Sequence, residues 1–418
     1  MWAWFILGCV SPDSGFSQAS RDPESPPPPV DDDVEVLDPN HVPRDDTSWW
    51  DETHAAPTPG VIDSDALNQA AISAFFAEGT LYDFKINLSP SSRGDLTKNP
   101  REWVPATFSA EGRSWPVMVA LKGTTSFRDL SGKAAFKVNF VAADPAQRFH
   151  GLKRLTLNAM VQDSSMMHEH VAYWLYRHRG VPAPRHTYAR VTVDGTNYGL
   201  HGVVETMDEQ FLKAVRPKDN NGNLYEGNVS DFIEGKTKHF EIEEEDGLYT
   251  PYADIDDEIA TLQATPSEGY MAMLDRDFDL DELMRMWAID IVTTNVDGYA
   301  WFANNYMAYH GEKAWHIWPW GHDQCLHWFR DVTDYSKLEG ELVRRCADTP
   351  ECRDRLEAEM LDLVTDWEQG ELEAMTVATA NLIQAECEAD PRRELPGETD
   401  DTVRFVRERP ATVREVLE

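Results

Sequence analysis

Polar and hydrophobic residues alternate along several short stretches of the first part of the chain. The clearest stretch is 81–88, where Leu, Asp, Lys and Asn lie opposite Tyr, Phe, Ile and Leu. This two-residue period is typical of a strand with one buried face. Residues 102–110, 115–121 and 134–140 follow, separated by turns with Gly, Ser and Asp. Together they predict an antiparallel sheet.

A helical period replaces this alternation after Asp163, which can cap a helix N-terminus. Apolar residues recur at spacings of three and four between 167 and 175, and Gly180 ends the helix. Residues 185–193 and 198–205 then return to the strand pattern on either side of an Asp-Gly turn, which is a hairpin signal.

The rest of the chain is mainly helical in pattern. Helices are predicted over 208–215 and 280–293, and the acidic, turn-rich segment 219–267 between them is interpreted as an insertion or mobile loop. A hairpin is predicted over 306–318. From Leu338 onward the pattern is helical again.

This order of elements predicts an α+β protein with two lobes. The N-lobe, residues 61–207, would hold an antiparallel sheet with one helix. The C-lobe, residues 208–418, would be mainly helical, with a helical C-terminal extension. The length of 418 residues and a hydrophobic content of 41% supply enough apolar side chains for one large domain or two smaller ones.

The net charge of −36 at pH 7 excludes two classes of partner. Non-specific nucleic-acid binding needs clustered Lys and Arg, which this chain lacks. Docking on anionic lipid through a basic face is disfavoured for the same reason. A strongly acidic surface is otherwise typical of a solubility or salt adaptation.

The N-terminal 60 residues predict an exported protein. Residues 1–9 are a short apolar run that ends in Ile-Leu-Gly-Cys and resembles a bacterial lipobox, with Cys9 as the lipidated residue. Residues 10–60 are acidic and rich in Pro, and we interpret them as a disordered tether. We expect a protein of the cell envelope, or an extracellular one, whose only membrane attachment is the lipid anchor.

Four further cysteines bear on the compartment. Cys346 and Cys352 bracket a short loop containing a Pro, and a local disulfide is the favoured pairing. Cys325 with Cys387 would then be a second pair. The alternative is that these cysteines are buried free thiols.

Two polar breaks within apolar runs carry the candidate chemistry. The first contains Asp297 and the adjacent Asn304 and Asn305, and the second ends in Asp323. A phosphoryl-transfer site needs a carboxylate near the acceptor hydroxyl, and Asp and Asn oxygens to hold the metal on the nucleotide phosphates. The same residue types also cap helices and form turns, so local sequence leaves both interpretations open.

A family resemblance separates these interpretations. Six short motifs occur in order between residues 117 and 324: Leu-Lys-Gly-Thr-Thr-Ser at 121–126, Lys-Ala-Ala-Phe-Lys-Val-Asn-Phe at 133–140, Gly-Val-Pro-Ala-Pro at 180–184, Tyr-Gly at 198–199 with Glu-Thr-Met-Asp at 205–208, Asn-Val-Asp at 295–297 with Asn-Asn-Tyr at 304–306, and Pro-Trp-Gly-His-Asp at 319–323. They resemble the motifs of the CotH kinase family over about half the chain. The resemblance implies an atypical protein-kinase-like fold that transfers the γ-phosphoryl of ATP, with Mg²⁺ or Mn²⁺, to Ser or Thr of an envelope or secreted protein.

The resemblance also implies roles for the acidic and amide residues. Asp297 would be the catalytic base that accepts the proton of the acceptor hydroxyl. Asn305, or its neighbour Asn304, would be a metal ligand, and Asp323 would hold the metal against the nucleotide phosphates.

The nucleotide needs a cation on a strand of the N-lobe. Lys133 and Lys137 are the favoured candidates because alternation places them on one strand face, and Lys122 is the third candidate. Glu169 in the predicted helix would pair with this Lys. Glu205, at the expected hinge between the lobes, would contact the nucleobase or its ribose.

The chain departs from the family pattern in three places. The family's Trp-Asp-x-Asp motif is Trp-Gly-His-Asp at 320–323, which lacks one carboxylate. His168-Glu-His170 replaces an Arg-rich helix start, and the first strands have no Gly-rich phosphate loop. The main alternative is therefore a non-catalytic, pseudokinase-like surface protein that binds or supports others. A hydrolase that uses Asp297 and Asp323 as paired carboxylates is a more distant one.

Overall fold

A computed structural model describes residues 65–418, except 246 and 329. The predicted lipidated Cys9 and the tether over 10–60 lie outside the described residues.

Seven strands close into a barrel in the order β1-β2-β3-β4-β5-β7-β6. They are β1 (Leu81–Leu88), β2 (Val104–Ala110), β3 (Arg113–Lys122), β4 (Ala135–Asn139), β5 (Arg154–Asn158), β6 (His186–Val193) and β7 (Thr196–Val204). All neighbours are antiparallel except β1 and β6, which pair in parallel from Leu81 opposite Tyr188. The predicted N-lobe sheet is thus confirmed but is not purely antiparallel, because the parallel pair joins its two edges. Closure leaves neither edge strand unpaired.

The N-lobe has more helix than predicted. Besides α3 (His168–His178), it contains α1 (Asp65–Phe75) and α2 (Pro90–Lys98). In α2 only Ser92 and Leu96 are buried, so it has almost no apolar period to detect. It forms because the Ser89 hydroxyl accepts from the Ser92 amide at 3.0 Å and Pro90 occupies the first turn.

The acidic segment 219–267 is folded, which corrects its interpretation as a mobile loop. It contributes β8 (Asn223–Gly227), β9 (Phe240–Glu244), the short 3₁₀ turn Thr237–His239 and α5 (Ala253–Ala264). With β10 (Tyr306–His310) and β11 (Trp315–Pro319), it forms a four-stranded sheet in the order β11-β10-β8-β9. β8 is buried because it pairs with β10 on one side and β9 on the other.

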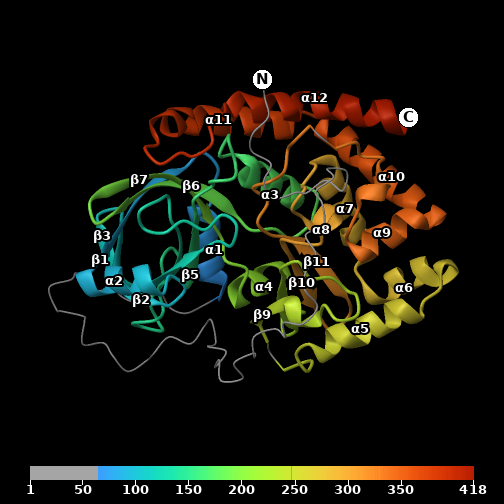
Figure 1. Ribbon diagram of the computed structural model, residues 1–418, viewed down its shortest axis with the longest axis horizontal. Helices are drawn as coiled ribbons and strands as arrows, with labels where there is room; N and C mark the ends of the chain where they lie inside the picture. Colours follow the sequence, from blue (N-terminus) through green and yellow to red (C-terminus); the bar gives the residue numbers. More distant parts are fainter. Residues whose placement is uncertain (1–64, 246, 329) are drawn as a thin grey trace, which may run out of the picture. The chain divides into compact units, whose positions relative to one another are not determined.

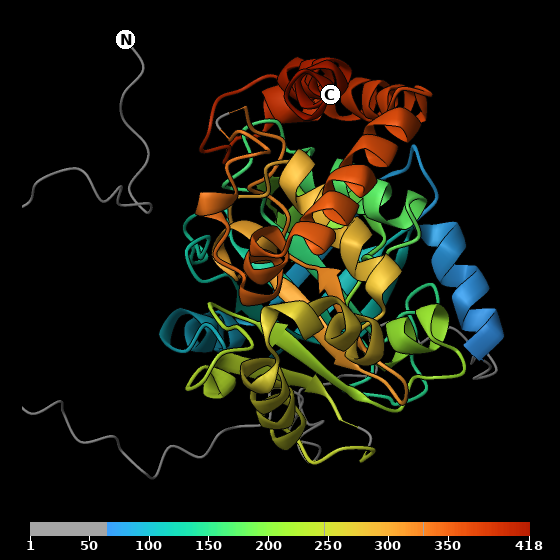
Figure 2. The same cartoon turned by 90° about the vertical axis from the view of Figure 1, so that its right-hand side faces the viewer.

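Helices surround this sheet and continue to the C-terminus (Figure 1). They are α4 (Glu209–Val215), α6 (Tyr270–Asp277), α7 (Leu280–Val292), α8 (Tyr299–Phe302), α9 (Glu341–Asp348), α10 (Pro350–Trp367), α11 (Glu371–Ala389) and α12 (Thr399–Leu417), with 3₁₀ turns at Ser267–Gly269 and Tyr335–Lys337. α10 packs on α7, and α11 packs on α12, α3 and β7. Figure 2 shows α11 and α12 side by side along one face. The C-terminal extension therefore contacts the N-lobe helix.

The described residues contain two large hydrophobic cores. One fills the barrel around Phe84, Phe108 and Phe149. The other gathers α3, α7, the second sheet and the C-terminal helices. Two cores and mixed secondary structure confirm the predicted α+β fold with two lobes. No helix among the described residues is both long and apolar enough to cross a membrane.

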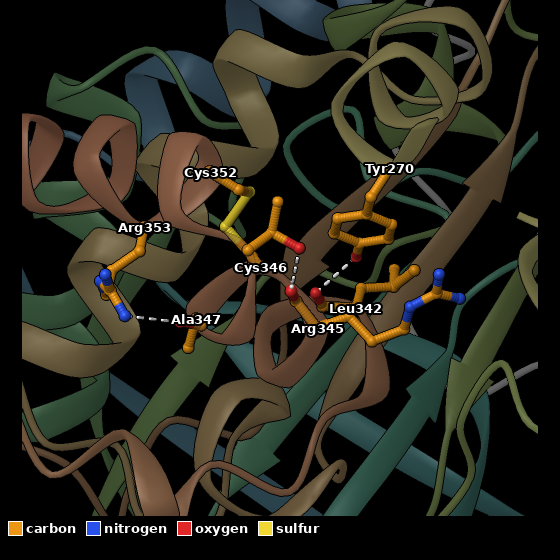
Figure 3. The surroundings of a disulfide bond; sticks show 8 residues. Tyr270, Leu342, Arg345, Cys346, Ala347, Cys352 and Arg353 are labelled. Atoms are coloured by element: carbon orange, nitrogen blue, oxygen red, sulfur yellow. Dashed lines mark hydrogen bonds between the residues drawn. A yellow bond between two sulfur atoms is a disulfide. The ribbon is translucent and has the colours of Figure 1, made fainter. Parts of the chain in front are cut away.

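Cys346 and Cys352 form the favoured local disulfide, which joins the end of α9 to the start of α10 (Figure 3). Cys325 and Cys387 are free and buried, so the second pairing that the sequence left possible does not form, and for these two the alternative of buried free thiols is confirmed. Each lies in a different packed environment: the Cys325 thiol faces the His322 carbonyl, and the Cys387 thiol faces that of Ser165.

Candidate active site

Asp297 lies in the loop between α7 and α8, and three side-chain amides hold its carboxylate. Asn304 donates to Oδ1 at 3.0 Å, and Asn305 donates to Oδ2 at 2.7 Å. Gln324 donates to the same Oδ2 at 3.0 Å. Burial raises the pKa of Asp297, although these three hydrogen bonds act to lower it. The result is an oriented, half-buried carboxylate that is a stronger base than a free Asp.

Backbone conformations that L-residues rarely adopt gather around this carboxylate. The residues with positive φ near it are Thr294 (54°), Ala303 (49°), Asn305 (48°), Leu326 (57°) and Val229 (48°). Such conformations are unfavourable, most of all for branched side chains, and persist where the surrounding structure holds them. Their concentration here is typical of a functional site.

Asp323 lies in the turn after β11, and its side chain is buried. Burial raises its pKa well above the usual value, and the charges of Glu169 and Asp297 raise it further. The charge of Lys122 acts in the opposite direction. The site therefore holds more carboxylate than positive charge, and a divalent cation would stabilise the ionised forms.

Glu169 on α3 and Lys122 at the end of β3 belong to the same cluster. The buried Glu169 carboxylate accepts hydrogen bonds from the Tyr173 hydroxyl at 3.0 Å and from the Asn158 amide. Burial raises the pKa of Glu169, and the charge of Lys122 is the strongest influence that lowers it. A strand Lys beside a helix Glu is the arrangement that holds the phosphate-binding Lys in ordinary kinases.

The structure separates the three candidate lysines. The Lys122 ammonium lies 5.3 Å from the centre of the Trp320 ring, two residues before buried His322 and three before Asp323. Lys133 is buried and forms an ion pair with Asp390 at 2.7 Å, just beyond α11. Lys122, the third candidate from the sequence, thus becomes the first candidate for the phosphate-binding lysine. Lys133 becomes the last, because it is paired with Asp390 of the C-terminal extension.

Lys137, the other favoured lysine, is exposed on β4. Its charge acts on Glu226 of β8 and Glu243 of β9. It therefore faces acidic side chains of the second sheet, while Lys122 acts on both Glu169 and Asp323.

Glu205 is buried at the predicted hinge, but its carboxylate already forms hydrogen bonds with Arg185. Arg185 donates to it through Nε at 2.8 Å and through its backbone amide at 3.0 Å. A contact between Glu205 and a nucleobase would therefore have to use backbone atoms.

Gly321 stands where the family motif has its first carboxylate, and His322, at the next position, is fully buried. Its Nε2 lies 3.2 Å from Asp290 Oδ1 and 3.0 Å from the Tyr176 hydroxyl. Asp290, also fully buried, accepts from the Asn295 side chain at 2.8 Å and from the Ala300 amide at 3.0 Å. This hydrogen-bonded group ties α3, α7, the Asp297 loop and the Asp323 turn together.

Sequence reasoning did not single out Gln324, Asp290 or His322 as contributors to the site. Gln324 adjoins a predicted ligand, but nothing in its pattern indicates that it reaches Asp297. Asp290 falls within a helical period, where a polar residue is usually solvated. For Lys122 a signal exists, since Val-Ala-Leu-Lys at 119–122 is similar to the V-A-I-K pattern of kinase strand β3.

Small apolar side chains lie close to this lysine. Ala135, which pairs with Lys122 across β3 and β4, forms a buried cluster with Ala159 and Val161, separate from both large cores. These side chains lie on the sheet face that carries Lys122.

Comparison with known proteins places these residues in a family. Inner spore coat protein H of Bacillus subtilis (strain 168) is 26% identical over 274 residues, covering 60% of this chain and 71% of that protein. Two solved structures are weakly similar. The Helicobacter pylori proinflammatory kinase CtkA has a TM-score of 0.27 at 10% identity, covering 63% of this chain and 89% of that one. The Shewanella oneidensis MR-1 complex of HipA, HipB and operator DNA has a TM-score of 0.34 at 11% identity, covering 80% and 71%.

Because both TM-scores are low, the assignment rests on the family comparison. The model described as CotH kinase protein matches residues 119–408, which include Lys122, Glu169, Asp297 and Asp323. The chain therefore belongs to the CotH kinase family.

Proposed function

We propose that this protein is an atypical kinase that transfers the γ-phosphoryl group of ATP to Ser or Thr hydroxyls of an exported protein. The observation that carries the proposal is the Asp297 carboxylate, held by three amides beside the buried Asp323. Phosphoryl transfer requires an oriented carboxylate for the acceptor hydroxyl and, next to it, a second carboxylate that binds the metal ion.

Asp297 acts on the acceptor. Its raised pKa suits a group that takes the hydroxyl proton as the acceptor oxygen bonds to the γ-phosphorus and ADP leaves. The amides of Asn304, Asn305 and Gln324 hold both carboxylate oxygens, so the base enters the reaction already oriented.

The residues present fit a divalent cation. Asn305 donates to Asp297 through Nδ2, which leaves Oδ1 for a metal, and Asp323 supplies a carboxylate oxygen. Gly321 allows this approach, since a Cβ there would lie 3.3 Å from Asn305 Oδ1. Bound Mg²⁺ or Mn²⁺ would neutralise charge on the transferred phosphoryl group.

The residues also fit a nucleotide. Lys122, which is held beside Glu169, is the cation that binds the phosphates. The cluster of Ala135, Ala159 and Val161 would contact the nucleobase. Lys137, on the neighbouring strand β4, faces Glu226 and Glu243 of the second sheet rather than the phosphates. Glu205 contributes at most through its backbone.

The test is transfer of ³²P from γ-labelled ATP by the full chain, with Mg²⁺ or Mn²⁺. We expect labelling of the protein itself or of a generic acceptor, a loss of at least about 100-fold in Asp297→Asn, and loss in Asp323→Ala. Lys137→Met is the matched control for Lys122→Met, since Lys137 lies on the neighbouring strand β4 and faces acidic side chains of the second sheet instead. Absence of both transfer and metal-dependent ATP binding would exclude the kinase.

One observation favours a second candidate, a non-catalytic protein that retains the fold. Gly321 replaces a motif carboxylate and has no side chain to bind a metal, and the neighbouring His322 is hydrogen-bonded to Asp290 and Tyr176. ATP binding with full Asp323 dependence but no transfer to any acceptor would support this candidate.

We also propose that the protein acts outside the cytoplasm. The Cys346–Cys352 disulfide supports an oxidising compartment. Attachment through a lipid at Cys9 remains part of this proposal, and mass measurement of the mature N-terminus in a bacterial host tests it.

A further inference from the structure

Three large hydrophobic side chains are exposed around the candidate base. Among the described residues, Val229 is 44% exposed, Phe302 39% and Trp328 41%. We call these three residues the apolar rim. Single exposed hydrophobic residues are common on proteins, so what is informative is the position of these three in segments next to Asp297.

Val229 is held at the site by a hydrogen bond that leads to Asp297. Its amide donates to Asn304 Oδ1 at 2.8 Å, while Asn304 Nδ2 donates to Asp297. Val229 also has a φ of 48°, which is costly for a β-branched residue. The fold thus maintains an unfavourable backbone that leaves an apolar side chain in solvent beside the base.

Phe302 follows the Asp297 loop along the chain, and Trp328 follows the Asp323 turn. Phe302 is the last residue of α8, and its amide donates to the carbonyl of Gly298, the residue after Asp297, at 3.0 Å. Trp328 lies five residues after Asp323 and packs on Phe405 of α12, with 4.8 Å between ring centres. The backbone of Phe302 and one side of the Trp328 ring are therefore held in place, and the rest of each side chain is exposed to solvent.

Arg330 adds a positive charge to the same region. Its guanidinium lies 5.6 Å from the centre of the ring of Trp301, the neighbour of Phe302. No carboxylate among the described residues forms an ion pair with it, and its buried Nε has no hydrogen-bond partner there. The chain has 74 acidic and 38 basic residues, so an Arg without a carboxylate leaves its charge available to an anionic group.

We propose that the apolar rim and Arg330 bind the acceptor segment of the substrate protein. The segment is extended, carries large apolar residues next to its Ser or Thr, and has an acidic residue within reach of Arg330. Apolar contact positions the hydroxyl at Asp297, and the charge pair sets the direction of the segment. This inference rests on the proposed function for the identity of the acceptor, but the binding surface can be tested without transfer.

The experiment measures binding of fluorescein-labelled peptides to the full chain by anisotropy, without ATP. One peptide has Leu-Ser-Leu-Glu at its centre, a second Ala-Ser-Ala-Glu, and a third Leu-Ser-Leu-Lys. We expect the first to bind at least about tenfold more tightly than the second, the gain that one or two buried apolar groups supply. We expect it to bind more tightly than the third because Arg330 attracts Glu and repels Lys.

Variants assign the preference to the surface. Phe302→Ser should remove the preference for Leu over Ala, and Phe302→Leu should retain most of it. Arg330→Gln should remove the preference for Glu over Lys alone. Val416→Ser is the control, because Val416 is equally exposed, at 46%, near the end of α12. Thermal unfolding of each variant checks that it is folded.

Equal binding of the three peptides, or an equal effect of Phe302→Ser and Val416→Ser, would overturn the inference. Failure of the kinase proposal is distinguishable, since it would abolish transfer while leaving the peptide preferences in place. Transfer to Ser without regard to its neighbours would exclude the acceptor surface and keep the kinase.

Discussion

Lys122 and Lys133 show how the same side chain acquires different roles through its neighbours. Lys122 is half-buried beside Trp320 and acts on two carboxylates of the site. Lys133 and Asp390 are 1% and 0% exposed, and each neutralises the other. Asp390 also accepts from the Leu200 amide at 2.9 Å. A buried pair of this kind is costly to break, because the remaining charge cannot reach water.

Replacement of Lys133 by Met should therefore act on stability. We expect the free energy of unfolding to fall by about 3–5 kcal/mol, as for other buried pairs that lose one partner. Urea denaturation followed by tryptophan fluorescence measures it. Lys137→Met, at an exposed position of β4 four residues later, should change stability by less than about 0.5 kcal/mol. Equal stability of the two variants would contradict the assigned role, and adding Asp390→Leu to Lys133→Met should recover much of the loss.

At the scale of elements, periodic patterns predicted those that bury one clear face. The strands β1 to β4 and the helices α3 and α7 fall close to their predicted ranges. The sequence reasoning missed α2, which has few apolar residues, and β5, which is buried on most of its length and does not alternate. The segment 219–267 was misjudged because its charge suggested solvent, whereas β8 pairs with β10 on one side and with β9 on the other.

The junction of α9 and α10 is stapled by Cys346 and Cys352 (Figure 3). Nearby, the Tyr270 hydroxyl donates to the Leu342 carbonyl, which ties α6 to α9. Because the disulfide closes a loop of only six residues, its effect on the unfolded chain is modest.

Replacing both of these cysteines by Ser should lower the free energy of unfolding by about 2 kcal/mol, the loop-closure value for so short a loop. Chemical denaturation with and without reductant measures it. Reductant should lower the stability of the native protein by a similar amount and leave the variant unchanged. If reductant destabilised the variant equally, another thiol would have to be involved.

Over the whole molecule, the net charge of −36 coexists with buried carboxylates of raised pKa. Burial raises the pKa of Asp231 to about 6 and that of Glu258 to about 7. Burial lowers the pKa of His201 to about 4, which acts in the opposite direction on the pH dependence of stability. The pH profile of the whole protein is therefore a sum of opposing contributions, and single substitutions are needed to separate them.

Asp231 is the group whose contribution to the pH dependence of stability is easiest to separate from the others. Its folded pKa of about 6 lies above the unfolded value of about 3.9, so the folded state binds the proton more tightly. Its contribution is fully present below about pH 3.9 and is lost as the pH rises through about 6, a change of about 3 kcal/mol. The stability of the native protein relative to Asp231→Asn should fall by most of this amount between pH 4 and 7. Denaturation at matched salt measures it, and a difference that is flat or rises with pH would refute the assignment.

The sequence by itself determined the class of fold, the family motifs and the loop residues Asp297, Asn305 and Asp323. These features are local, because periodicity and short motifs depend on neighbours along the chain. Tertiary structure alone decided which lysine reaches the carboxylates, that Cys325 and Cys387 stay free, and how the barrel closes. The physical reason is that burial and electrostatic contact depend on which distant segments pack together, as Asp390 does on Lys133, and a linear pattern carries no record of that distance.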